Sequence, residues 1–281
     1  MRVIGRAVVI GMAVALAGTL PRDLLFKANL HYWPAFPWGT PIVAVYIWFF
    51  WRYLNGAGES DSTKAERRAG FRANSVSRPA WVWSLLTGAF GIAAFVLALR
   101  LANRLIVLPP QSLHDLPQVP ESTMLSWLLM SAPVAGIVEE AAFRGYMQGP
   151  IERRYGLVVA ILITGTFFAI AHLDFTPILW PYYVAVAAIY GTVTYRTNSI
   201  MPAIVLHAAA NLYSNLDLWL YGHAEWQAAA GPSVLIWKSG VDPSLVSWSF
   251  ALVGVGAAAA GAYLMLVRAT PEQGRAFARS V

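Results

Sequence analysis

The sequence predicts an all-α, polytopic membrane protein with about eight transmembrane helices around a polar intramembrane cavity. Of its 281 residues, 58% are hydrophobic and 12% are charged, whereas soluble domains carry about 25% charged residues, and the mean hydropathy is +0.54. Apolar segments follow one another along the chain, and ionisable side chains interrupt several of them. Because no polar block is long enough for a separate soluble domain, we expect residues 1–281 to form a single membrane domain.

Eight apolar segments are long enough, alone or with their flanks, to cross the core of a bilayer. They are Val3–Leu20, Thr40–Leu54, Trp81–Leu101, Met124–Gln148, Leu157–His172, Ile178–Tyr195, Ile200–Tyr221 and Ser244–Val267. The second and the fifth are short for a span and are expected to extend into their flanks. In the last segment, Gly254, Ala258 and Gly261 form a small-residue face that predicts close packing against another helix.

The first segment allows a second interpretation. Arg2 and Arg6 precede an apolar run that contains Ala15-Leu16-Ala17, which resembles the cleavage site of a secretory signal peptide. The run is long for the apolar core of a signal peptide, so we favour a retained helix. Both interpretations place the amino terminus inside.

The Lys and Arg residues predict the orientation, because they concentrate in cytoplasmic loops. With eight spans and the amino terminus inside, the outer loops keep few of the 20 Lys and Arg residues, namely Arg22, Lys27, Arg100, Arg104 and Lys238. Every other one except the intramembrane Arg144 falls on the inner side. We therefore expect both termini to be cytoplasmic and residues 55–79 to form a solvated cytoplasmic linker. The compact, loop-poor chain favours a multi-pass protein of a bacterial inner membrane.

The formal net charge of +6 comes from loops and tails, so the expected partners include anionic membrane lipids. Nucleic acid is not an expected partner, because it would need a basic soluble surface. The chain has no cysteine, which excludes disulfides, thiolate metal sites and cysteine nucleophiles.

Three ionisable side chains, Glu139, Glu140 and Arg144, lie inside the fourth apolar segment. Each costs about 2.5–3.5 kcal/mol near the centre of a membrane helix, and such groups are therefore functional candidates. Glu140 and Arg144 are four residues apart, so they share a helix face and can pair. Glu139 is turned by about 100° from Glu140, which leaves it to face a group outside its own helix.

Two further polar sets lie in later apolar segments. Phe168 and His172 share one face at the end of the fifth segment, and His207 and Asn211 share one face in the seventh. A single membrane His or Asn often serves only as a hydrogen bond between helices, worth about 0.6 kcal/mol. Two polar groups on one face, as at His207 and Asn211, need a shared partner and favour a functional site.

Together these side chains predict hydrolysis of an amide by an activated water. A carboxylate and an imidazole can deprotonate water, and an imidazole and a carboxamide can donate hydrogen bonds to an oxyanion. Neither a Gly-x-Ser-x-Gly nucleophile motif nor a His-Glu-x-x-His zinc helix is present.

The three motifs, in this order on successive membrane segments, resemble those of the CPBP (Abi) intramembrane proteases, which include the type II CAAX prenyl endopeptidases. They are Glu139-Glu140-Ala-Ala-Phe-Arg144, Phe168-Ala-Ile-Ala-His172 and His207-Ala-Ala-Ala-Asn211. The resemblance covers residues 127–215, which would form the protease motif core. It implies an intramembrane endopeptidase that acts on membrane-associated protein or peptide substrates. Prenylated CAAX substrates are expected only if the host prenylates proteins.

The resemblance also implies a role for each residue. Glu139 and His172 would activate the attacking water, and His207 and Asn211 would form the oxyanion hole. Glu140 and Arg144 would be a supporting pair that helps to hold the substrate. No cofactor follows with certainty, but Glu139, His172 and His207 could ligate zinc with a water in the fourth place.

Two other functions stay open. A transporter or proton relay also uses buried Glu, His and Arg, but it predicts inverted repeats, and none is visible in the sequence. A non-catalytic immunity or scaffold member of the same family is the second alternative, although every motif position is intact.

The spacing does not place Glu139 and His172 at the same depth in the membrane. At 1.5 Å per residue, Glu139 lies roughly 14 Å from the inner end of its segment and His172 roughly 22 Å from the inner end of its own. The mismatch shrinks if the segment of His172 starts below the membrane plane. It also shrinks if Pro133 and Gly136 bend the segment of Glu139.

Overall fold

The computed structural model describes residues 2–107, 119–172, 177–222 and 234–271, and these residues form helices and turns without a strand. The helices are α1 (Arg2–Tyr32), α2 (Gly39–Leu54), α3 (Asp61–Phe71), α4 (Arg78–Ala102), α5 (Glu121–Glu139), the π-helix η2 (Glu140–Gln148), α6 (Gly149–Tyr155), α7 (Leu157–Ala171), the 3₁₀ turn η3 (Pro177–Leu179), α8 (Trp180–Thr197), α9 (Met201–Tyr221), α10 (Ile236–Ser239) and α11 (Pro243–Ala269). Each of the eight predicted apolar segments forms a helix, which confirms the all-α class.

The polytopic membrane class is also confirmed. Four helices in the described part of the chain are long and apolar enough to cross a membrane: α1, α4, the continuous rod from Glu121 to Tyr155, and α11. The helix α7 is apolar but shorter. How many of the remaining helices span the bilayer stays a prediction.

The fourth apolar segment differs from its prediction. It is not one α-helix from Met124 to Gln148 but a rod in which α5, η2 and α6 follow one another as far as Tyr155. The rod therefore extends beyond the end that its hydropathy indicated, and α7 begins directly after the turn at Gly156. Glu139 and His172 then lie nearly the same number of residues from this turn, which removes most of the mismatch in depth.

A close crossing of α5 and α9 positions the polar residues. Gly136 of α5 faces α9, where an added Cβ would lie 2.9 Å from the carbonyl oxygen of Ile204 and 3.2 Å from the Cβ of Ala208. A larger residue at position 136 would push the two backbones apart. Glycine here therefore allows Glu139 and Glu140 to reach His207 on the facing helix.

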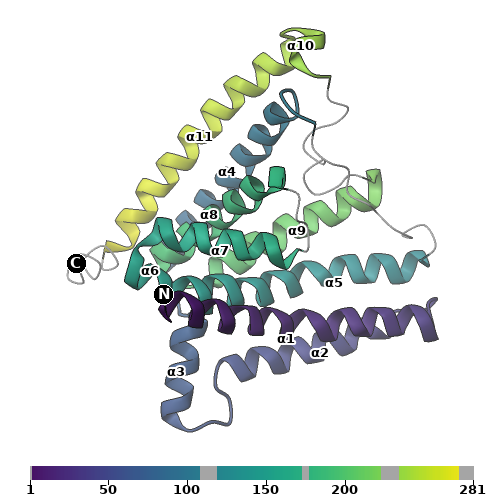
Figure 1. Ribbon diagram of the computed structural model, residues 1–281, viewed down its shortest axis with the longest axis vertical. Helices are drawn as coiled ribbons and strands as arrows, with labels where there is room; N and C mark the ends of the chain where they lie inside the picture. Colours follow the sequence, from purple (N-terminus) through teal and green to yellow (C-terminus); the bar gives the residue numbers. More distant parts are fainter. Residues whose placement is uncertain (1, 108–118, 173–176, 223–233, 272–281) are drawn as a thin grey trace.

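The helices α4 and α11 form a separate pair that stands at an angle to α1, α2 and α5 (Figure 1). Just beyond the last residue of α4 an ion pair of 2.7 Å joins Arg104 to Asp242, and Arg100 lies over the ring of Trp248. The predicted small-residue packing face on α11 is wrong, because an added Cβ at Gly254 or Gly261 would meet no atom within 4 Å.

The loop of residues 55–79 is more than the solvated linker that its polarity predicted. It contains the helix α3, and Phe71 at the end of α3 is fully buried against the ring of Trp51. The hydroxyl of Tyr146 in η2 donates a hydrogen bond of 3.1 Å to the carbonyl of Arg67. The loop therefore packs against the π-helix, because its few apolar and backbone groups find partners there.

We expect the predicted orientation to be visible by single-cysteine labelling, which the cysteine-free chain permits. Ser62 and Ala35 are both exposed and lie at opposite ends of α2. With the amino terminus inside, Ser62→Cys should react with a membrane-impermeant maleimide only after the cells are opened, whereas Ala35→Cys should react in intact cells. The reverse labelling pattern would contradict the inference from the Lys and Arg distribution.

Candidate active site

The centre of the site is an ion pair buried among apolar helices. Glu140 is the first residue of η2, and its side chain and that of Arg144 are both fully buried. Arg144 Nη1 lies 3.2 Å from Glu140 Oε1, so the two residues pair as their spacing predicts. The angle is not that of a hydrogen bond, and the guanidinium nitrogens make none within the described residues. The pair is therefore held by charge, and the surrounding rings must supply the remaining contacts of Arg144.

Two aromatic rings supply those contacts. The guanidinium carbon of Arg144 lies 4.9 Å from the ring centre of Phe168 on α7 and 5.4 Å from that of Tyr190 on α8. A guanidinium over an aromatic face is attracted by the ring quadrupole, more strongly where water is excluded. Arg144 is thus held by aromatic residues from two other helices, α7 and α8.

His207 of α9 lies between the two glutamates. Its Nδ1–H donates a hydrogen bond of 2.7 Å to Glu140 Oε1, and its Nε2 lies 3.6 Å from Glu139 Oε2. The imidazole stacks on Tyr190 with 4.9 Å between ring centres and an angle of 13°. His207 is therefore fixed in both position and ring orientation.

The two glutamates have different surroundings although they are adjacent in the sequence. Glu140 is sealed from solvent, whereas 16% of the side chain of Glu139 is exposed. The described residues offer no hydrogen bond to Glu139 Oε2. Glu139 is thus the more exposed of the two side chains, although its Oε2 is itself buried and approaches His207 Nε2 at 3.6 Å.

His172 ends α7 and is exposed. Its Nδ1–H donates a hydrogen bond of 2.8 Å to the carbonyl of Phe168, and its ring packs at 4.6 Å from Phe168 and 4.8 Å from Tyr183. Within the described residues these contacts engage the ring through Nδ1 and its faces, which leaves Nε2 as the nitrogen without a bond to them. A direct contact between His172 and Glu139, which the implied roles would need, is not among those formed in this structure.

A cavity of about 360 Å³ adjoins these residues. His172, His207 and Asn211 line it together with Ser214. The rest of its wall is mostly apolar and aromatic and comes from α4, α8 and α9, including Ile92, Phe95, Val96, Leu99, Tyr182, Val186 and Leu206. The expected polar intramembrane cavity is thus polar at one side only.

The proposed zinc ligands do not converge in this structure. No three His, Asp or Glu side chains of the described residues gather closely enough to hold a metal ion. His207 directs one ring nitrogen at Glu140 and the other toward Glu139, and a metal ligand would have to give up one of these contacts. The arrangement of Glu139, His172 and His207 therefore does not fit a zinc site.

Several residues of the site were not singled out from the sequence. Tyr190, Tyr183 and Phe143 form its aromatic shell, but aromatic residues are common in membrane helices and carry no spacing signal. Asn215, by contrast, was visible in the sequence one turn beyond Asn211 on the same face, and in the structure it ties α9 to α5. Its amide donates hydrogen bonds to the carbonyl of Leu128 and to Ser131 Oγ.

Two comparisons with known proteins found a match. The family model described as "Type II CAAX prenyl endopeptidase Rce1-like" matches residues 121–213, the stretch that contains all three motifs. The chain is also 30% identical over 156 residues to the UPF0177 protein YxdF of Lactococcus lactis subsp. lactis (strain IL1403), which covers 52% of this chain and 83% of that protein. No solved structure matches the chain.

We expect the Glu140–Arg144 pair to be revealed by stability in detergent. Removing one partner of a buried pair leaves an uncompensated charge and costs about 3–5 kcal/mol, whereas replacing both is far less costly. Arg144→Leu should therefore aggregate at a much lower temperature than the wild type. Adding Glu140→Gln should restore most of the loss, because a carboxamide oxygen can still accept from His207.

Size-exclusion chromatography after a heating series measures this difference. The exposed Arg154→Leu is the matched control, because its charge is already solvated and should be removable at little cost. Equal stability of the Arg144→Leu single variant and the double variant would show that the two side chains do not depend on each other.

Proposed function

Because the chain belongs to the CPBP family, the family of the type II CAAX prenyl endopeptidases, we propose that it is an intramembrane endopeptidase that cleaves membrane-associated proteins or peptides by a glutamate-activated water. The observation that carries the proposal is the meeting of two carboxylates and His207 from facing helices beside a cavity lined by His172 and Asn211. Family membership supports a protease in general. The type of mechanism and the substrate are our inference.

Glu139 is the proposed base. It is the more accessible of the two glutamates, and a general base needs access to water and a free lone pair. Glu140 lacks access to water, since it is fully buried and its Oε1 is bound to His207 and paired with Arg144. Glu139 would take a proton from water as the water oxygen bonds to the peptide carbonyl carbon. It would then return the proton to the leaving nitrogen as the C–N bond breaks.

His172 is proposed to orient the same water. Its ring is fixed through Nδ1 by the Phe168 carbonyl, so only Nε2 is free to contact a water or substrate. The ring lines the cavity together with His207. A water held between Glu139 and His172 would therefore lie at the edge of the space where a substrate can enter.

His207 and Asn211 are proposed to stabilise the oxyanion. They lie one turn apart on α9 and both line the cavity. Because the Nδ1–H of His207 is donated to Glu140, a second donor at Nε2 requires a protonated ring. Donors fixed before the reaction in a site that excludes water stabilise a developing oxyanion most effectively.

The cavity supports a substrate with an apolar group near the cleaved bond. Its wall toward α4 and α8 carries Phe95, Leu99, Tyr182 and Val186, so an apolar side chain or lipid group would be shielded there. Burial of apolar surface stabilises by about 25 cal/mol per Å². A prenylated CAAX-type substrate is consistent with this wall but not required by it.

We expect Glu139→Gln to abolish turnover and leave folding and peptide binding intact. The change is nearly isosteric and removes the proton acceptor. Asn211→Ala should instead slow the chemical step by about 10²–10³-fold, the usual cost of one oxyanion donor. Turnover and affinity are measured for both variants and the wild type in one detergent, with a panel of lipidated and membrane-anchored peptides.

Near wild-type turnover of Glu139→Gln, or an effect of Asn211→Ala on binding alone, would contradict these roles. Absence of turnover in the wild type on every peptide would favour a non-catalytic family member. Proton-coupled flux in vesicles would favour the transporter.

We expect the reaction to proceed without zinc, because the candidate ligands among the described residues do not converge. Treatment with a chelator should leave turnover unchanged, and elemental analysis of active protein should find far less than one zinc per chain. Stoichiometric zinc, with activity lost on chelation and regained on adding zinc, would overturn the proposal.

A further inference from the structure

Arg72 is a buried arginine outside the three motifs. It follows the last residue of α3 with φ 58°, in the left-handed region, and it is only 3% exposed. A residue other than glycine seldom adopts this conformation unless its surroundings hold it there. Burial lowers the pKa of its guanidinium, an effect that the carboxylate of Glu152 opposes. Both the backbone strain and the burial require compensation from specific partners.

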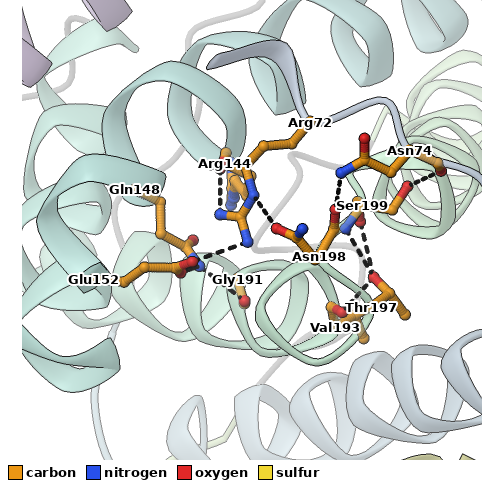
Figure 2. Close-up of polar contacts among 10 residues, drawn as sticks. All are labelled: Arg72, Asn74, Arg144, Gln148, Glu152, Gly191, Val193, Thr197, Asn198 and Ser199. Atoms are coloured by element: carbon orange, nitrogen blue, oxygen red, sulfur yellow. Dashed lines mark hydrogen bonds and ion pairs between the residues drawn. The ribbon is translucent and has the colours of Figure 1, made fainter. Parts of the chain in front are cut away.

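Figure 2 shows those partners, which come from three elements. Arg72 Nη2 forms an ion pair of 2.9 Å with Glu152 of α6, which is itself buried. Nη1 donates a hydrogen bond of 3.3 Å to the backbone carbonyl of Arg144 in η2. Nε donates one of 3.2 Å to Asn198 Oδ1, in the turn between α8 and α9. The planar guanidinium can serve three directions at once, which a lysine ammonium on a flexible stem cannot reproduce.

The carbonyl of Arg144 needs this donor because of the change from π-helix to α-helix. In a π-helix such as η2 an N–H bonds the carbonyl five residues back, but the N–H of Gly149 bonds Gly145, four residues back. Such a change of register passes over one carbonyl, and here it is the carbonyl of Arg144. Arg72 thus satisfies the backbone group that the end of the π-helix leaves free.

The backbone of the same segment holds the start of α9. The carbonyl of Arg72 accepts a hydrogen bond of 3.0 Å from the N–H of Ile200, directly before α9. Asn74 donates a hydrogen bond of 2.7 Å to the carbonyl of Asn198, and Ser199 Oγ donates one of 2.7 Å to the carbonyl of Asn74. The segment from Arg72 to Asn74 therefore joins the helix of Arg144 to the helix of His207.

We propose that Arg72 is a positioning residue that fixes η2 against the start of α9 and so keeps Glu140 within hydrogen-bond distance of His207. This inference rests on the proposed function for its effect on catalysis. Glu140 and His207 belong to different helices and meet at 2.7 Å. A displacement of about 1 Å at a catalytic group can cost about 10²-fold in rate. A contact at the inner end that links both helices is therefore able to control the rate without touching the substrate.

The test compares Arg72→Lys with Arg67→Lys. Both variants keep the charge, and the Arg72→Lys variant keeps the backbone strain at its position. Arg67 is part of α3, and its guanidinium pairs with Glu59, donates to the carbonyl of Tyr53 near the end of α2 and lies over the ring of Tyr53. We expect Arg72→Lys to lower kcat by about 10- to 100-fold with KM unchanged, and Arg67→Lys to behave as the wild type.

Asn198→Gly should also lower kcat, because glycine keeps the left-handed backbone at φ 49° and removes only the side-chain acceptor of Arg72 Nε.

A second readout does not need activity. In protein labelled with ¹⁵N-histidine, the Nδ1–H of His207 should give a downfield proton signal that His207→Asn removes. Arg72→Lys should shift or broaden this signal, and Arg67→Lys should not. If the wild type cleaves no peptide, the proposed function fails, and the signal alone then decides whether Arg72 positions the pair.

Two results would overturn the inference. One is an unchanged His207 signal in Arg72→Lys. The other is a loss of turnover that only follows the loss of folded protein, so that kcat per folded molecule equals that of the wild type.

Discussion

The constraint on which the rest of the structure depends is the compensation of charge at Glu140 and Arg144. Both side chains are fully buried, in a region where each unpaired charge costs several kcal/mol. Their own helix provides one ion pair, but it leaves the faces of the guanidinium and part of the carboxylate without contacts. His207, Phe168 and Tyr190 supply these contacts from α9, α7 and α8. The helices of the site are therefore brought together by one pair of charges as well as by apolar packing.

The same constraint separates the roles of two adjacent glutamates. Successive residues on a helix point about 100° apart, so the contacts that seal Glu140 cannot also seal Glu139. Glu139 keeps partial access to solvent, with 16% of its side chain exposed. The imidazole of His207 lies between them, with Nδ1 2.7 Å from Glu140 Oε1 and Nε2 3.6 Å from Glu139 Oε2. The proposed activation of water would use both carboxylates, the buried one to fix the ring and the more exposed one beside the same ring as the base.

The sequence predicted those features that depend on local spacing. The apolar segments became helices, and the separation of Glu140 and Arg144 gave the ion pair. It did not predict the π-helix, because hydropathy is insensitive to whether a carbonyl is bonded four or five residues on. It also placed the inner end of the rod at Gln148, because Arg153 and Arg154 suggested a loop, whereas the helix continues to Tyr155. The importance of Arg72 was hidden because its partners are distant in the sequence, with Asn198 126 residues away. A basic residue in an inner loop is common and by itself indicates orientation only.

The rod that carries the site is held at two points along its length. Glu140 and Arg144 are engaged by α9, α7 and α8, and Glu152 is engaged by Arg72 from the inner loop. A shift of the rod by one residue, about 1.5 Å, would break the bond to His207 and the ion pair to Arg72 together. A rotation of the rod would do the same, because it would turn Glu140 away from His207 and Glu152 away from Arg72. Loss of the ion pair would leave the buried charges of Arg72 and Glu152 uncompensated, and loss of the bond to His207 would leave a buried donor without its partner. The two contacts together therefore define both the depth and the rotation of Glu139.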